Sequence, residues 1–382
     1  MFHLPRIVAS IGGVPRLMAD PFNPRFPKPS PEGPFIPPDL DLDEPPISAL
    51  PMPELASPII PNTLHSIRAY RYRSSRDAWK HVPNLSTEEV RDLLDEDEAH
   101  YSTTLRIVTW NVDFMTEHAE ERLIAALRHI ERDVLMCNGD APFEPACICL
   151  QEVRTDMLPV ILEDQWIRNH FAVTPISVTK WPEHAGYGNV TLVSRALTVV
   201  KCEIMHYGQT EMGRTALAVY VMMSEPEPSA ANAVVCVVNT HLESLPQGAI
   251  ARPRQMELAS RFLKQPNVRG GVVVGDMNAL GPGDSNLPMD CGLRDVWREG
   301  SDKDKKGHTW GYQGQNKGPN GIKYPAARLD KILYLPRRAY RMDPLERVGV
   351  DVKVKGVEGE PWVSDHYGLA TTLRLVARRN ST

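Results

Sequence analysis

The feature that most constrains the fold of this chain is a long series of short, apolar, strand-like runs that begins near Leu105. The runs are LRIVTWNV, CICLQEV, YGNVTLVS, TALAVYVMM, AVVCVVNTH, GGVVVGDMN, RLDKILYL and HYGLATTLRL. Helical periodicity separates some of them, at residues 117–131, 155–169 and 252–263, whereas strand follows strand directly between Tyr187 and His241. This mixture predicts two packed β-sheets with helices outside them, rather than a purely doubly wound sheet.

One of these runs, GGVVVGDMNAL at residues 270–280, changes abruptly from apolar to polar. Asp276 and Asn278 stand two residues apart at its end, and such residues point to the same side of an extended chain. A buried carboxylate is costly without a partner, so the pair indicates a binding or catalytic site. An Asx turn that ends an ordinary strand is the alternative.

Several other apolar runs also end or begin in acids, amides or imidazoles. These residues are Asn111 and Asp113; Gln151 and Glu152; Asn239, His241 and Glu243; Asp330; and Asp365 and His366. One polar strand end is ordinary, but the repetition predicts a single site assembled at the rims of two sheets.

The residue types at these strand ends favour one chemistry. Carboxylates and amides without thiolates are hard oxygen ligands, which suit Mg²⁺ or Mn²⁺ rather than zinc. His241 and His366 can donate to a phosphate oxygen or exchange protons near neutral pH. Together these groups predict metal-assisted hydrolysis of a phosphoester. The chain has neither a GxSxG elbow nor a GxxxxGK[ST] loop, so a serine hydrolase and a nucleotide triphosphatase are disfavoured.

Composition limits the partners. A net charge of −5 provides no overall attraction to nucleic acid or anionic membranes, so a polyanion needs a local basic surface. Arg337, Arg338 and Arg341 are a candidate for such a surface. No apolar run reaches the roughly 18–20 residues that span a bilayer.

The six cysteines form no CxxC pair, which indicates reduced thiols in an intracellular protein. We expect a nuclear or cytoplasmic monomer. A mitochondrial location is an alternative, because the first nineteen residues lack acids.

Proline divides the chain. Roughly half of the 34 prolines precede residue 62, which favours extended, solvated backbone. We therefore expect residues 1–100 to form a proline-rich arm with a short acidic helix capped by Ser86 or Thr87. Residues 101–377 are expected to form the catalytic domain, followed by a tail at 378–382. The glycine-rich, polar stretch at residues 300–325 predicts a long surface loop.

The motifs TWNVD, LQEV, THLES, GDMN, RLDK and SDH, in this order, resemble the endonuclease/exonuclease/phosphatase superfamily. The resemblance covers about residues 105–375. It implies a four-layer α/β sandwich of the DNase I-like kind, with two mixed β-sheets packed face to face and flanked by helices.

Further residues resemble the 5′-tyrosyl-DNA phosphodiesterase branch of that superfamily. HLES is followed by Arg252 and Gln255, SDHYGL is similar to the branch's SDHWGL, and MGRTAL supplies Arg214. Tyr187 stands where the branch keeps an aromatic residue beside the scissile tyrosine. The chain departs from the branch at GDMNAL, which is not followed by the arginine typical of the branch.

The resemblance implies a role for each candidate residue. Glu152 would bind the metal directly, and Asp113 and Asp365 would bind it through water. Asp276 would orient the attacking water, while Asn278, Asn111 and His241 would contact the phosphate. His366, held by Asp330, would stabilise charge on the reacting phosphorus. The implied substrate-binding residues are Tyr187, Arg214 and Arg252. Tyr187 as a core residue, Arg214 as a solvated charge and His241 as a structural histidine remain alternatives.

We therefore expect a Mg²⁺-dependent phosphodiesterase of DNA repair, with Mn²⁺ as a possible substitute. Its expected substrate is a 5′-phosphotyrosyl linkage left by a trapped topoisomerase, on a single-stranded or 5′-overhanging DNA end that carries a protein or peptide adduct. The alternatives are an abasic-site or general nuclease, a lipid or inositol phosphatase, and a non-catalytic binding module recruited through the arm.

Overall fold

The computed structural model describes residues 59–95, 101–137, 143–227, 229–297, 307–313 and 324–377. The predictions for residues 1–58 and for the tail at 378–382 lie outside the described residues.

The apolar runs form two mixed β-sheets, as the sequence predicts. The seven-stranded sheet has the order β1 (His65–Ile67), β8 (Thr198–His206), β9 (Thr215–Ser224), β10 (Asn232–His241), β11 (Val268–Asp276), β13 (Asp330–Tyr334), β12 (Arg294–Asp295). The nine-stranded sheet has the order β14 (Tyr340–Met342), β16 (Gly368–Leu375), β4 (Thr104–Asn111), β5 (Ala146–Arg154), β7 (Tyr187–Ser194), β6 (Phe171–Thr174), β2 (Tyr70–Arg73), β3 (Ala78–His81), and β15 (Glu346–Val348) also pairs with β16. Only β10–β11 and β4–β5 pair in parallel among these strands; the remaining pairs are antiparallel.

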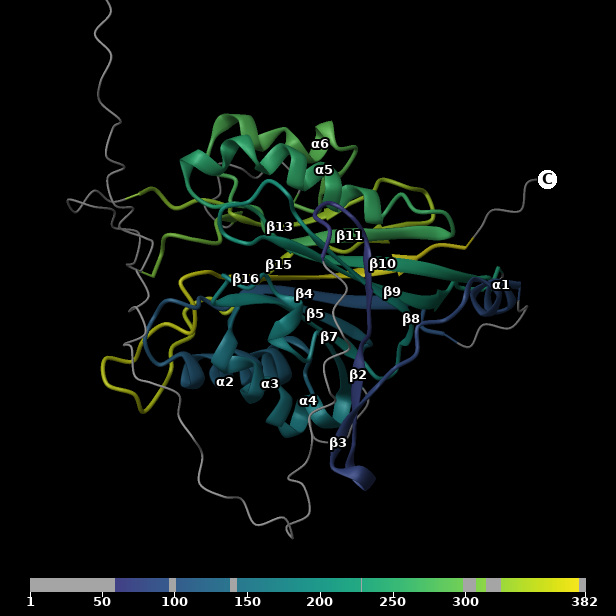
Figure 1. The fold of residues 1–382 in the computed structure, drawn as a ribbon, viewed down its shortest axis with the longest axis horizontal. Coiled ribbons are helices and arrows are strands. Elements are labelled where there is room, and N and C mark those ends of the chain that lie inside the picture. Colours follow the sequence, from purple (N-terminus) through teal and green to yellow (C-terminus); the bar gives the residue numbers. More distant parts are fainter. Residues whose placement is uncertain are drawn as a thin grey trace, which may run out of the picture.

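Helices cover the outer faces of both sheets, which makes four layers (Figure 1). The α-helices are α1 (Thr87–Asp95), α2 (Ala119–His129), α3 (Leu158–Glu163), α4 (Gln165–His170), α5 (Arg252–Phe262) and α6 (Leu287–Asp290). Helix α2 continues into a π-helical segment, Ile130–Val134, and short 3₁₀ helices lie at Ser74–Arg76, Thr155–Met157, Val178–Lys180, Pro246–Ile250 and Pro282–Ser285. The three predicted helical regions are therefore confirmed. None of the described helices combines the length and the apolar character needed to cross a membrane.

Alternation of side chains along the strands builds the core. In β4, Leu105 and Ile107 pack into the apolar layer between the sheets, whereas Val108 and Trp110 pack against the helices outside. The same alternation in β11 sends Val272 and Val274 inward. Both faces of these strands are buried, which explains why the runs are apolar throughout. All six cysteines are free thiols, and only Cys291 is not fully buried.

The folded domain begins earlier than the sequence predicts. Strand β1 pairs with β8, and β2 joins β6 in the other sheet, so residues from His65 onward extend both sheets. The boundary at residue 101 is therefore wrong for this segment, because the proline-rich composition ends well before the acidic helix. The helix itself is confirmed: Ser86 and Glu89 form a capping box, with Oγ–N and Oε2–N distances of 3.2 and 2.6 Å.

Candidate active site

The predicted site residues meet where neighbouring strands end or begin in register. His241 at the end of β10 lies beside Asp276 at the end of β11. Asp276 in turn stands opposite Asp330, the first residue of β13. Asn111 ends β4 in the facing sheet, and His366 lies two residues before the start of β16. Strand order thus brings distant parts of the sequence to one edge of the sandwich.

Asp276 is the centre of this cluster. Its Oδ2 lies 3.2 Å from the donating amide nitrogen of Asn111, 3.3 Å from His241 Nε2 and 3.8 Å from His366 Nε2. The side chain is buried, and burial followed by repulsion from Asp330 raises its pKa. A desolvated carboxylate among three nitrogens can accept a proton from a bound water, which suits a general base.

His366 is held by Asp330. Asp330 Oδ2 accepts a hydrogen bond from His366 Nδ1 at 2.7 Å, so Nε2 faces Asp276. Burial alone would lower the pKa of His366, but the carboxylates of Asp330, Asp365 and Asp276 together raise it well above its ordinary value. These carboxylates favour the imidazolium form of the ring, which can donate to an anionic oxygen.

His241 is held by Arg214 in a different protonation state. An arginine can only donate, so His241 Nδ1 accepts from Arg214 Nη1 at 2.8 Å and the remaining hydrogen lies on Nε2. Burial and then the charges of Arg214 and His366 lower the pKa of His241 well below its ordinary value. His241 thus directs a buried Nε2–H without a hydrogen-bond partner among the described residues toward Asp276, and its contact with a phosphate oxygen stays a prediction.

Tyr187 and Arg214 belong to the same cluster. Arg214 Nη1 donates to the Tyr187 hydroxyl at 2.9 Å, and the Tyr187 ring stacks on Phe114 with centroids 4.0 Å apart. Arg214 is buried and also donates to Ser244 at 2.8 Å, so it is not a solvated surface charge. The two residues form an aromatic and cationic wall beside Glu152. Burial foremost raises the pKa of Tyr187; the charge of Arg214 opposes this rise, and the charge of Glu152 adds to it.

Glu152 projects into the site because its strand is irregular. The pairing of β5 with β7 shifts register between Leu150 and Val153, and Glu152 has a φ of 58°. Its oxygens accept from Asn111 Nδ2 at 3.0 Å and from the Phe114 amide at 3.2 Å. Burial, then the charges of Asp113 and Asp365, raise the pKa of Glu152 to about 7. These carboxylates repel one another and offer oxygen atoms as metal ligands, which fits a hard divalent cation.

Asp113 and Asp365 flank Glu152, and each is already hydrogen-bonded. Asp113 Oδ2 accepts from the buried guanidinium of Arg122 at 2.8 Å and from the Thr116 hydroxyl. Asp365 Oδ2 accepts from the indole nitrogen of Trp310 at 3.0 Å, and burial foremost raises the pKa of Asp365 to about 6. The charges of both residues act on Glu152, and their contact with a metal through water stays a prediction.

Sequence reasoning missed Trp310 and Arg122. Trp310 lies in the stretch predicted to be a surface loop, yet its backbone pairs with His366 and with Ala327. Residues 307–313 thus remain a loop in which Tyr312 is exposed, but Trp310 and Thr309 pack into the domain rather than lying on its surface. A lone tryptophan in a polar stretch is the signal that could have indicated this packing. Nothing in the spacing of Arg122 on an amphipathic helix distinguishes it from a solvated residue.

Asn278 lies at the site by a different route from the one predicted. Strand β11 ends at Asp276, and Asn278 has a φ of 46°, so strand alternation does not continue to it. Its backbone nitrogen donates to Asp276 Oδ1 at 2.9 Å, which is the Asx turn weighed as the alternative. Its amide donates to the Leu242 carbonyl at 3.0 Å. Contact between Asn278 and a phosphate stays a prediction.

Arg252 is not placed to bind a substrate, and that prediction is wrong. The residue is 1% exposed, and its Nε and Nη2 donate to the two oxygens of Asp284 at 2.9 and 2.8 Å. Its Nη1 donates to the carbonyls of Glu243 and Leu245. With every donating nitrogen occupied inside the protein, Arg252 ties the start of α5 to the loops around it.

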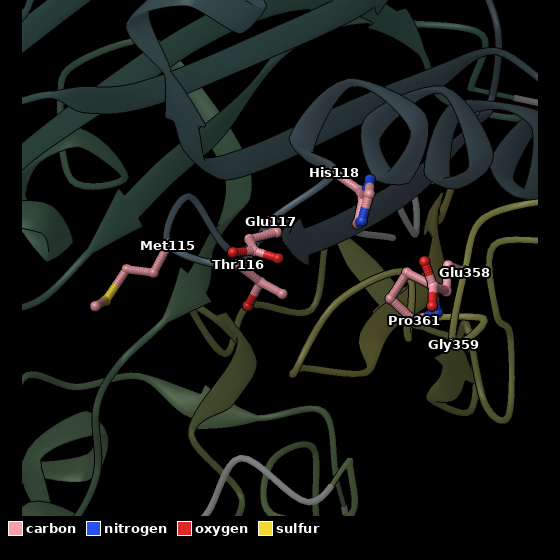
Figure 2. Close-up of a pocket in the computed structure, with 7 residues that line it drawn as sticks. All are labelled: Met115, Thr116, Glu117, His118, Glu358, Gly359 and Pro361. Atoms are coloured by element: carbon pink, nitrogen blue, oxygen red, sulfur yellow. The ribbon is translucent and has the colours of Figure 1, made fainter.

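A pocket opens beside the loop that follows β4. It has a volume of about 440 Å³ and is lined by Met115, Thr116, Glu117, His118, Glu358, Gly359 and Pro361 (Figure 2). Thr116 connects it to the site through Asp113. The pocket itself contains none of the converging residues described above.

Comparison with known proteins agrees with this geometry. The model of the endonuclease/exonuclease/phosphatase family matches residues 108–366. Among curated protein sequences, none matches this chain. Truncated Caenorhabditis elegans TDP2 has a similar structure, with 22% identity, a TM-score of 0.51, and coverage of 71% of this chain and 97% of that chain. D. rerio TDP2 in complex with a single-strand DNA product has 18% identity and a TM-score of 0.53, with coverage of 71% and 99%. Humanized D. rerio TDP2 has 19% identity and a TM-score of 0.52, with coverage of 72% and 100%.

These similarities confirm the predicted superfamily and its fold of two mixed sheets between helical layers. Members of this superfamily hydrolyse phosphoric esters, so the enzyme class predicted from the strand ends is confirmed as well. The chain belongs to the endonuclease/exonuclease/phosphatase family.

Proposed function

We propose that this protein is a Mg²⁺-dependent phosphodiesterase that acts on DNA ends and hydrolyses a 5′-phosphotyrosyl linkage. The observation that carries the proposal is the convergence of Asn111, His241 and His366 on one oxygen of Asp276. This arrangement places a proton acceptor among donors that suit an anionic phosphate.

The residues divide the reaction between them. A water molecule beside Asp276 gives up its proton to the Asp276 carboxylate as its oxygen attacks the phosphorus. The neutral Nε2–H of His241 and the amide of Asn111 donate to non-bridging phosphate oxygens. The His366 imidazolium, fixed by Asp330, stabilises the added negative charge. The bond between phosphorus and the tyrosine oxygen breaks in line, which leaves a 5′-phosphate and a free tyrosine.

Glu152 would hold the metal ion, with Asp113 and Asp365 behind it. When bound, Mg²⁺ polarises a phosphate oxygen and offsets the charge of the leaving oxygen. The repulsion that raises the pKa of Glu152 to about 7 supports this assignment, because a cation there would relieve it. Mn²⁺ has similar ligand preferences and could substitute.

The aromatic wall supports a tyrosyl leaving group. Tyr187 stacks on Phe114, and Arg214 lies 5.4 Å from the centroid of the Tyr187 ring. A flat apolar face next to a guanidinium suits a phenolic ring that leaves with negative charge. The similar D. rerio structure contains a single-strand DNA product, which supports a DNA end as the substrate.

A substrate panel tests this proposal. The full chain is incubated with a 5′-phosphotyrosyl oligonucleotide, an abasic duplex and a phosphoinositide, each with Mg²⁺ and with EDTA. We expect conversion of the first substrate to a 5′-phosphate end in Mg²⁺ alone. Preferential cleavage of the abasic duplex or the phosphoinositide would keep the family chemistry and overturn the tyrosyl substrate. Cleavage of none of them in Mg²⁺ or Mn²⁺ would favour a binding module.

A further inference from the structure

A second groove, at the other end of β13 from the catalytic cluster, has features that the reaction does not use. Its volume is about 890 Å³, and its lining includes Arg294, Arg337, Arg338 and Arg341 together with Tyr334, Tyr340, Met342 and Leu345. We name this feature the arginine groove: the four arginines form its rim, and the four other residues form its floor.

The groove exists because both sheets end in short strands on this side. The seven-stranded sheet ends with the two-residue β12, and the nine-stranded sheet ends with the three-residue β14. The apolar layer between the sheets is therefore left open at their edge. Tyr334, Met342 and Leu345 pack against that layer, and the rings of Tyr334 and Tyr340 meet edge to face with centroids 6.5 Å apart.

The rim carries positive charge without compensation. All four rim arginines are exposed, and no ion pair or side-chain hydrogen bond within the described parts of the chain involves Arg294, Arg338 or Arg341. The two acids in the lining are already paired elsewhere. Asp295 lies 2.6 Å from Arg328, and Asp343 lies 2.7 Å from Arg374.

The arginine groove is connected to the active site by one strand. Asp330 begins β13 at the catalytic cluster, and Tyr334 ends it in the floor of the groove. Four residues of extended strand span about 13 Å, which is short enough for one flexible polymer to reach both places.

We propose that the arginine groove binds the single-stranded DNA that continues beyond the scissile end. This inference rests on the proposed function, since it assigns the groove to the same substrate. Guanidinium groups bind phosphates through paired hydrogen bonds, and an aromatic floor accepts bases without sequence preference. An acidic peptide would match the rim but would not need an aromatic floor, so the observations favour the nucleic acid.

The double variant Arg338→Ser/Arg341→Ser tests the groove, and Arg132→Ser/Arg261→Ser is its control. The control removes the same charge from exposed residues on the outer helical layers. Binding of a fluorescent 12-nucleotide oligo(dT) by each full-length protein is measured by anisotropy, in EDTA and over a range of salt concentrations. Turnover of p-nitrophenyl thymidine 5′-monophosphate, which is too short to reach the groove, is measured in Mg²⁺.

We expect the groove variant to weaken oligo(dT) binding and to reduce the slope of log K against log salt by about 1.4, since each lost phosphate contact on a single strand contributes about 0.7. Turnover of the small substrate should match that of the wild type and the control. An unchanged salt slope would overturn the groove assignment even if the small substrate is cleaved. Binding of a fluorescent poly-glutamate peptide that is lost in the groove variant, with no binding of oligo(dT), would overturn it in favour of an acidic partner.

A wild-type protein that binds oligo(dT) through the groove but cleaves no phosphodiester would contradict the proposed function alone. The binding assay needs no turnover, so the two proposals can fail separately.

Discussion

Replacing Arg252 with methionine should destabilise the protein strongly while leaving substrate affinity near its wild-type value. Arg252 is 1% exposed and forms two hydrogen bonds to Asp284 and two to backbone carbonyls. Methionine keeps an apolar stem of similar length but removes all of these donors. The change therefore leaves a buried carboxylate without its partner.

The structure sets the size of this effect. Breaking a buried pair by removing one partner costs about 3–5 kcal/mol, because the remaining charge is uncompensated. For a domain of this size, each kcal/mol shifts the melting temperature by roughly 2–4 °C, so the midpoint should fall by about 6–20 °C. Asp284 Oδ2 also accepts from the amides of Leu280 and Gly281, so the loop after Asn278 would loosen as well.

Thermal and urea unfolding of the variant and the wild type measure the loss, and KM is determined well below the transition. Arg254→Met is the matched control on the same helix. Arg254 is 44% exposed and pairs with the equally exposed Glu257, so its loss should leave the midpoint nearly unchanged. A wild-type midpoint for Arg252→Met together with a raised KM would refute the reasoning and restore Arg252 as a substrate contact.

Three further changes test individual site residues. Asp330→Asn removes the carboxylate that raises the pKa of His366, so the rate should fall about 10²–10³-fold and the basic limb of the pH–rate profile should move to lower pH; an unmoved limb would contradict the assignment. Trp310→Phe removes the indole donor to Asp365, and we expect weaker activation by Mg²⁺ in a metal titration, whereas an unchanged midpoint would make Trp310 a packing residue only. Tyr187→Ala should reduce kcat/KM for tyrosyl oligonucleotides more than for a nitrophenyl phosphodiester; equal losses would mean that Tyr187 does not contact the leaving tyrosine.

Much of the active site could be predicted from the sequence because its residues form a local pattern: an apolar strand that ends or begins in a polar residue. A polar residue at the end of an apolar strand must lie at the edge of a sheet, and neighbouring strands bring such ends together. His241, Asp276 and Asp330 are adjacent in register for this reason. The helices and the free cysteines follow from equally local patterns.

The remaining features depend on partners that the sequence does not reveal. The motif that contains Arg252 does not show that Asp284 lies opposite it. A buried structural ion pair was therefore predicted to be a substrate contact. Gln151, expected among the site residues, instead donates to Asn239 and Thr109 within the buried layer between the sheets. Strands β1 and β2 pair with residues of β8 and β6 more than a hundred positions away, which no local pattern indicates.

The central claim, that Asp276 activates a water molecule which cleaves a phosphotyrosyl ester, is tested most directly by single-turnover kinetics. Wild type and Asp276→Asn are each mixed in excess with a 5′-phosphotyrosyl oligonucleotide in Mg²⁺, and the 5′-phosphate product is followed over time. We expect full conversion by the wild type and a rate about 10²–10⁴-fold slower for the variant, with an unchanged melting temperature. Equal rates for the two proteins would contradict the account.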